Sequence, residues 1–147
     1  MFKWLRRAVC GIPEEQIAKF CAGRSTQSDE QFLLASGLPP DAETARVAIA
    51  VRRAVANIGA VDPQFVRPDD AYPDQLAVLP LWDSMDWFAF RMELEEQLGD
   101  RFSHEEFKRL FDGSGASISV KEMVDGVQRV LANRRNAEHG TAPDGGS

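Results

Sequence analysis

Ser84 is the residue of this sequence whose type and surroundings best suit chemistry. It lies between Asp83 and Asp86 in the stretch LPLWDSMDWFAFRMELEEQLG, residues 79–99, at the point where helical spacing of apolar residues begins. The first turn of a helix offers unpaired backbone N–H groups and a positive dipole end, and both favour a phosphate ester. The position of Ser84 is therefore compatible with a phosphate ester. The alternative is that Ser84 or Asp83 is only an N-cap, whose oxygen accepts a backbone N–H.

Other chemistry finds little support in the sequence. A serine hydrolase needs a strand–turn–helix elbow and a histidine base, but no GxSxG precedes Ser84, and we interpret His104 and His139 as solvated bystanders. Cys10 and Cys21 form no CxxC pair, which argues against a zinc or redox site and favours free thiols in a reducing cytoplasm. Acidic residues spread along one helix do not converge as in a calcium loop. We therefore expect a protein that is not an enzyme, with no metal site.

The helix expected over residues 83–98 carries two apolar stripes. At about 100° per residue, one group clusters within roughly 80°, and a second lies about 150° away from it. The longer stripe is the natural core face and contains Trp87, Phe90, Leu94 and Leu98. The second predicts an exposed patch for a partner, with Met85, Phe88 and Met92. The alternative is a helix buried on all sides.

Acidic residues are expected to rim this exposed patch. They are Asp83, Asp86, Glu93, Glu95, Glu96 and Asp100. A patch of this kind favours a partner with a basic surface.

Three further helices are expected to position this one. The first covers residues 41–59, with Val47, Val51, Val55 and Ile58 at helical spacing and Gly59 as its stop. A long connection over 60–82, rich in proline, is expected to be pinned to the core by Phe65, Val66, Leu76 and Leu79.

Two capping boxes predict the last two helices of the domain. Ser103 and Glu106 open a short helix with Phe107, Leu110 and Phe111, and Ser119 and Glu122 open the clearest helix of the sequence. That last helix has an apolar stripe of Val120, Met123, Val124, Val127, Val130 and Leu131. No strand pattern competes with these helices, so the predicted fold is an all-α bundle.

The two ends of the chain are expected to lie outside this bundle. Residues 1–40 are interpreted as a helical extension, with short helices after Pro13 and Ser28 and a boundary at SGLPPD. Phe2 and Trp4 lie beside Arg6 and Arg7 in a short arm, which we expect to pack as an amphipathic segment rather than to touch a membrane. Residues 41–132 form the domain, and residues 133–147 are expected to be a disordered tail.

The composition bounds the function further. A chain of 147 residues with 44% hydrophobic residues fits one domain with a single core. The formal net charge of -6 argues against a nucleic-acid partner, which requires a basic face. No run is long enough for a membrane span or a signal peptide, so we expect a soluble, cytoplasmic protein with no stable membrane insertion.

The order and motifs of residues 43–131 resemble the acyl carrier and peptidyl carrier protein family. DSMD followed by MELEEQLG is similar to the DSLD motif and the glutamate-rich recognition helix of that family, while RPDD and SVKEMVDGV match weaker patterns. The resemblance implies an acyl-carrier-like four-helix bundle. It also implies that Ser84 carries 4′-phosphopantetheine, attached from coenzyme A by a phosphopantetheinyl transferase that uses magnesium.

On this resemblance the thiol of the arm holds an acyl group as a thioester, of fatty acid or polyketide metabolism. The partners are then the transferase and acyl-transferring enzymes with basic docking surfaces. The sequence departs from the family pattern at Leu81, where carriers usually have glycine, and Trp82 is a bulky neighbour of the motif. The alternative function is an unmodified adaptor that docks proteins through the same helix.

Overall fold

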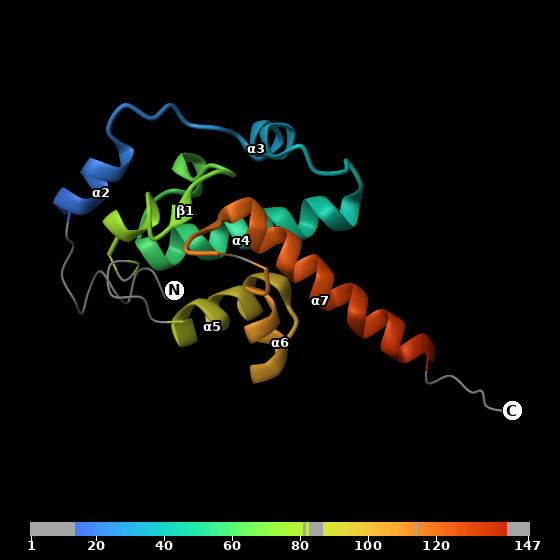
Figure 1. Ribbon diagram of the computed structural model, residues 1–147. Helices are drawn as coiled ribbons and strands as arrows, with labels where there is room; N and C mark the ends of the chain where they lie inside the picture. The colour runs from blue at the N-terminus through green and yellow to red at the C-terminus, as the bar shows by residue number, and fades with distance from the viewer. Residues whose placement is uncertain (1–13, 81, 83–86, 114, 141–147) are drawn as a thin grey trace, which may run out of the picture.

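The computed structural model describes residues 14–80, 82, 87–113 and 115–140, without the side chains of 139 and 140 (Figure 1). These residues are mostly helical, as predicted. Their α-helices are α2 (Glu14–Cys21), α3 (Asp29–Ser36), α4 (Ala42–Gly59), α5 (Trp87–Leu98), α6 (His104–Arg109) and α7 (Val120–Gly140). Two 3-10 turns, η1 (Pro63–Phe65) and η2 (Leu76–Val78), lie in the connection between α4 and α5.

Side-chain caps fix where these helices begin. Ser28 and Ser103 form capping boxes with Gln31 and Glu106, and Asp41 accepts the backbone N–H of Thr44. Ser119 and Glu122 exchange the same pair of hydrogen bonds at the start of α7. The predictions at Ser28, Ser103 and Ser119 are therefore confirmed.

Helix α4 lies at the centre of the molecule and packs against both α5 and α7. Its four predicted core residues, Val47, Val51, Val55 and Ile58, have no exposed surface. The helix ends at Gly59, as predicted, but Gly59 is still helical, and it is Ala60 that takes the left-handed conformation, with φ 59°. A Cβ on Gly59 would lie 2.7 Å from Leu79 Cδ1, so close packing explains the glycine better than chain reversal does.

The connection between α4 and α5 packs side chains into the core, as predicted. Val66, Leu76 and Leu79 are fully buried. It also contains β1 (Ala71–Tyr72), which pairs antiparallel with β2 (Ile118–Ser119). The expectation of no strand is thus wrong for these two residue pairs. Such a short ladder has no alternating apolar pattern from which to predict it.

Helix α7 extends further than predicted. The tail was expected to lack structure from Asn133 onward, but the helix continues to Gly140, and its last turns project beyond the other helices (Figure 1). Arg134 holds part of this extension on α6, because its Nε lies 2.7 Å from the Glu106 carboxylate. Residues 141–147 of the expected tail lie outside the described residues.

The two N-terminal helices share the core of the bundle. Phe20 of α2 and Phe32 of α3 are buried and belong to the same apolar cluster as α4, α5 and α7. SGLPPD is therefore a turn within one apolar cluster, and the division of the chain at residue 40 stays a prediction. α2 packs on η2, and α3 packs on α4.

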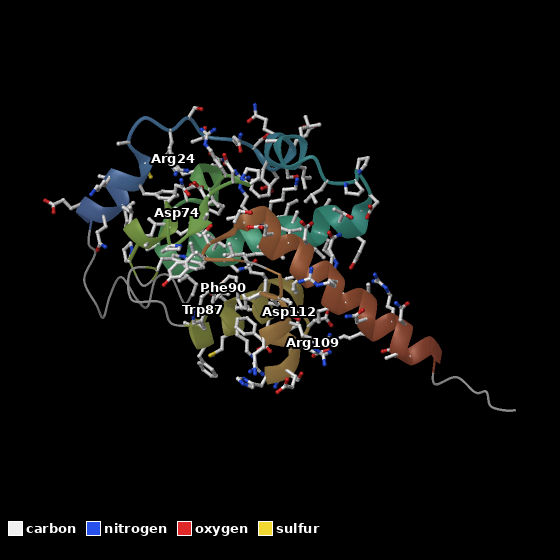
Figure 2. All side chains as sticks on the ribbon, viewed as in Figure 1. Arg24, Asp74, Trp87, Phe90, Arg109 and Asp112 are labelled. Carbon is white, nitrogen blue, oxygen red and sulfur yellow. The ribbon has the colours of Figure 1, made fainter. Side chains whose placement is uncertain are left out.

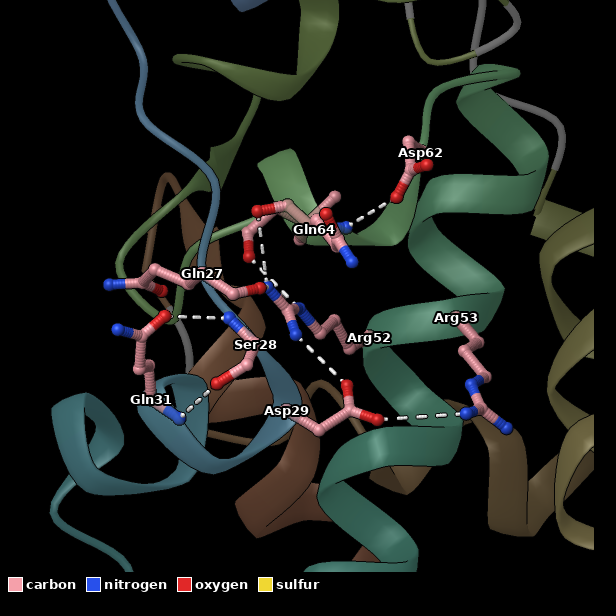
Figure 3. Close-up of polar contacts among 9 residues, drawn as sticks. Gln27, Ser28, Asp29, Gln31, Arg52, Arg53, Asp62 and Gln64 are labelled. Carbon is pink, nitrogen blue, oxygen red and sulfur yellow. Dashed lines mark hydrogen bonds and ion pairs between the residues drawn. The ribbon is translucent and has the colours of Figure 1, made fainter.

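A fully buried arginine strengthens this attachment. Arg52 of α4 donates to the backbone oxygens of Gln27 (2.8 Å) and Val66 (3.1 Å) and to the carboxylate of Asp29 (3.0 Å), as Figure 3 shows. Its guanidinium also lies 4.5 Å from the centre of the Phe32 ring. Burial lowers the pKa of this guanidinium, and the hydrogen bond to Asp29 opposes that shift. Arg52 therefore joins α3, α4 and the loop after η1.

Candidate functional site

Helix α5 has one buried and one exposed apolar side, as the two-stripe pattern predicts. Phe90, Leu94 and Leu98 are buried against the rest of the bundle. Phe88 and Met92 are 65% and 48% exposed. The alternative of a helix buried on all sides is therefore wrong for these residues.

The N-terminal end of α5 is held by a cluster of aromatic rings. Trp87 meets Phe111 at a centroid distance of 4.6 Å and Tyr72 at 5.6 Å, both edge to face. Phe90 packs against Trp82 at 5.5 Å. Figure 2 places Trp87 and Phe90 on the stretch of α5 that meets the rest of the molecule. Aromatic pairs of this geometry contribute beyond their buried area, so they fix the direction in which α5 starts.

Trp82 anchors the chain just before the motif. Its indole is fully buried, and its Nε1 donates to the backbone oxygen of Val55 on α4 at 3.0 Å. The Trp82 and Trp87 rings are 6.4 Å apart. The core therefore holds both residues that bracket positions 83–86.

Four of the predicted site residues lie between these two tryptophans, outside the described residues. They are Asp83, Ser84, Met85 and Asp86. The phosphopantetheine attachment at Ser84, the role of Asp83 and the docking roles of Met85 and Asp86 stay predictions.

The acidic rim of α5 is narrower than predicted. Glu96 is exposed beside Met92, as expected, but the placement of Glu93 on this surface is wrong. The Glu93 carboxylate is buried and accepts hydrogen bonds from Asn57 Nδ2 (2.8 Å) and Gln97 Nε2 (3.0 Å). The position of Glu93 along α5 did not predict its burial. The carboxylate is tolerated between α4 and α5 because Asn57 of α4 donates a hydrogen bond to it.

Glu95 also faces inward in part. Its carboxylate accepts the backbone N–H of Phe102 at 2.8 Å and lies 3.5 Å from Arg91 Nε. This contact fixes the turn that follows α5. Glu96, Phe88 and Met92 are thus the predicted docking residues that the described surface presents to solvent.

A second apolar surface was missed in the sequence. Leu34 is 78% exposed and lines an open groove of about 490 Å³ with Leu33, Leu38, Pro39, Pro40 and Ala45. The signal was present in FLLAS, because three consecutive large apolar residues on a short helix cannot all face one core. Phe32 takes the buried position, which leaves Leu34 outside.

The described residues offer neither a group of metal ligands nor a membrane-spanning helix. Within them, no group of three or more His, Cys, Asp or Glu side chains gathers as metal ligands would. His104 is exposed at the first position of α6. No helix in the described part of the chain is long and apolar enough to cross a lipid bilayer.

The chain was compared with family models, curated proteins and solved structures. No family model, no curated protein and no solved structure matches this chain.

Proposed function

We propose that this chain is a carrier-type protein that holds an acyl group on 4′-phosphopantetheine at Ser84 and docks partner enzymes through α5. The observation that carries the proposal is the exposed pair Phe88 and Met92 on the helix that directly follows DSMD. The order of elements supports it as well, since a long helix, a long connection, a middle helix, a short helix and a last long helix succeed one another.

The residues beside the motif are compatible with the prosthetic group. Trp82 is a bulky neighbour of the motif, but its indole is fully buried and donates a hydrogen bond to α4, so it does not project into the space outside the bundle. Leu81 lies outside the described residues. When bound, the group supplies a thiol that carries the acyl chain as a thioester, and Ser84 is its anchor.

The described part of α5 would supply the docking energy. Burying a side chain of this size gains about 1.5 to 3 kcal/mol, so Phe88 and Met92 together offer roughly 3 to 6 kcal/mol before the costs of association. A gain of this size suits transient encounters. Glu96 adds attraction to a basic partner, which salt weakens.

Intact-mass measurement tests the attachment. The chain is co-expressed with several active phosphopantetheinyl transferases, and the wild type should gain one phosphopantetheine while Ser84→Ala gains none. Leu81→Gly should be modified at least as readily, because it restores the residue that carriers have at this position. A wild type that stays unmodified while a known carrier in the same cells is loaded would reject the carrier function.

The second candidate function is an unmodified adaptor. It is favoured by the exposure of Phe88 and Met92, because an exposed apolar pair can bind a partner without any group on Ser84. An adaptor should bind its partner equally well as Ser84→Ala and should lose binding in Phe88→Ser. Partner capture that fails for Ser84→Ala but survives for Phe88→Ser would reject it.

A further inference from the structure

A polar pocket lies where the end of α3, the loop over 66–70 and the start of α7 meet. Its volume is about 380 Å³, which is typical of small-molecule sites. Two lining residues are Ala35 and Pro68, and the rest are polar or charged, namely Gln27, Ser36, Arg67, Asp69, Ser119 and Lys121. This lining suits a polar ligand and does not suit an acyl chain.

Backbone hydrogen bonds hold the walls of this pocket in place. Lys121 N, in the first turn of α7, donates to Pro68 O at 2.9 Å. Gln27 N donates to Gln64 O at 2.9 Å, and Gln27 O accepts from Arg52 Nη2 at 2.8 Å, as Figure 3 shows for the second contact. The fold therefore sets the shape of the pocket before any ligand binds.

The side-chain amide of Gln27 has unused hydrogen-bonding capacity. Its Oε1 is buried, and no described residue donates to it. Several other glutamine amides of the described chain are engaged, namely those of Gln16, Gln31, Gln75, Gln97 and Gln128. A buried amide oxygen without a donor is unfavourable. The last torsion of glutamine is broad, so this amide can turn and offer Oε1 to a group bound in the pocket.

Two cationic side chains line the same pocket. Arg67 Nη2 donates to Ser25 O (2.6 Å) and Oγ (3.1 Å), which orients the guanidinium and leaves Nε and Nη1 as further donors. Lys121 is exposed, and its ammonium forms no ion pair with a described residue. With Asp69 included, the lining has two positive charges and one negative. The net charge of +1 matches a monoanion, and both cations suit a carboxylate.

We propose that this pocket binds a small hydroxycarboxylate. The carboxylate contacts Arg67 and Lys121, and a hydroxyl donates to Gln27 Oε1. A hydroxyl fits the site better than an ammonium, because a zwitterion has no net charge to match that of the lining. This site is separate from α5, and it goes beyond the carrier function because it needs no group on Ser84.

Gluconate, sorbitol and hexanoate test the site in the full chain, because their carbon chains have the same length. Sorbitol lacks the carboxylate of gluconate, and hexanoate lacks its hydroxyls. NMR at fixed ionic strength follows the backbone amides of residues 119–121 and the side-chain amide of Gln27, assigned from Gln27→Leu. Gluconate should shift these signals saturably and bind at least about tenfold more tightly than sorbitol or hexanoate.

Two variants each remove one contact to the ligand. Lys121→Gln and Gln27→Leu should each weaken gluconate binding by about tenfold, read from the backbone amides of 119–121. Both should fold, because Lys121 is exposed and no described residue donates to Gln27 Oε1. The matched control is Lys108→Gln, which changes an exposed lysine on α6 and should bind gluconate like the wild type.

Four results would overturn the proposal. The first is no saturable shift of residues 119–121 with gluconate. The second is hexanoate that binds as tightly as gluconate, since the hydroxyls then make no contact. The third is inorganic phosphate that binds as tightly, since the pocket is then a general anion site. The fourth is equal affinity of Lys121→Gln and Lys108→Gln for gluconate, which would place the ligand elsewhere.

Discussion

At the scale of single residues, two nearby phenylalanines of α5 differ in burial and therefore in their expected roles. Phe90 is buried among Trp82, Trp87 and Phe107, whereas Phe88, two positions earlier, is 65% exposed. The same side chain therefore stands at two positions of one helix, once buried and once exposed. Substituting each in turn compares the two environments directly. A difference in their contribution to stability comes from their surroundings.

Truncating these two residues should separate folding from docking. Phe90→Ala should lower the free energy of unfolding by about 3 to 5 kcal/mol, because it leaves a cavity among packed rings. Phe88→Ala should change it by no more than about 0.5 kcal/mol. Urea unfolding followed by circular dichroism measures both. Equal and large losses would mean that Phe88 also stabilises the fold, and the docking role of this face would lose its basis.

At the scale of elements, one ion pair fastens the C-terminal part of α7 to α6. Arg134 Nε and Nη2 both donate to the Glu106 carboxylate, at 2.7 and 2.8 Å, while Glu106 also caps α6 by accepting the N–H of Ser103. The hydrogen bonds from Arg134 are the main reason that the pKa of Glu106 falls to about 2.

This depressed pKa predicts an acid-sensitive contact. Glu106 has a lower pKa in the folded chain than in the unfolded one, so its stabilisation is complete above about pH 4.5 and is lost as the pH falls toward about 2. Since the side chain still reaches water, we expect about 1 to 2 kcal/mol of stability to disappear over this interval. Glu106→Gln keeps the capping geometry and should remove that part of the pH dependence. Unfolding curves of both proteins at pH 2.5, 3.5 and 5 measure it, and parallel profiles would contradict the role of the pair.

The helices themselves were largely predictable, and the reasons are local. A cap such as Asp41 or Ser119 followed by apolar residues at helical spacing carries its information within one turn or along one face. Glu93, Arg52 and the continuation of α7 past Asn133 were not predictable in this way. Each depends on a partner distant in sequence, namely Asn57, the Gln27 carbonyl and Glu106, so no local pattern contains the signal.

Of the candidate site, the exposed apolar face of α5 was predictable, whereas the roles of residues 83–86 stay predictions. The exposure of Phe88 and Met92 and the burial of Phe90 follow from their angles around one helix. The groove of Leu34 required knowing which of Phe32, Leu33 and Leu34 faces α4, and packing between α3 and α4 decides this.

At the scale of the whole molecule, the core extends into the N-terminal helices. Polar contacts reinforce this attachment, among them the ion pair of Arg24 with Asp70 (2.8 Å) and the hydrogen bonds of the fully buried Arg52. The backbone oxygens of Gln27 and Val66 depend on its guanidinium for a donor. Its neighbour Arg53 has a side chain that is 52% exposed and lies 3.6 Å from the same Asp29. The two arginines therefore differ in burial and share a partner.

Replacing each by methionine should show how firmly residues 14–36 belong to the fold. Arg52→Met should lower the free energy of unfolding by about 3 to 5 kcal/mol, because it strands buried acceptors. Arg53→Met should cost no more than about 0.5 kcal/mol. Thermal and urea unfolding measure both. If Arg52→Met unfolds like the wild type, the N-terminal helices add little to stability, and a separable extension becomes the better description.

The two tryptophans beside the motif also give the protein an intrinsic spectroscopic signal. Trp82 is sealed from solvent and Trp87 is half-buried, and their rings are 6.4 Å apart at an angle of 90°. Emission and near-ultraviolet dichroism of such a pair respond to small changes in ring separation and polarity. Whatever attaches between residues 82 and 87, or settles on the helix that follows, therefore changes a signal that is intrinsic to the chain and needs no added dye.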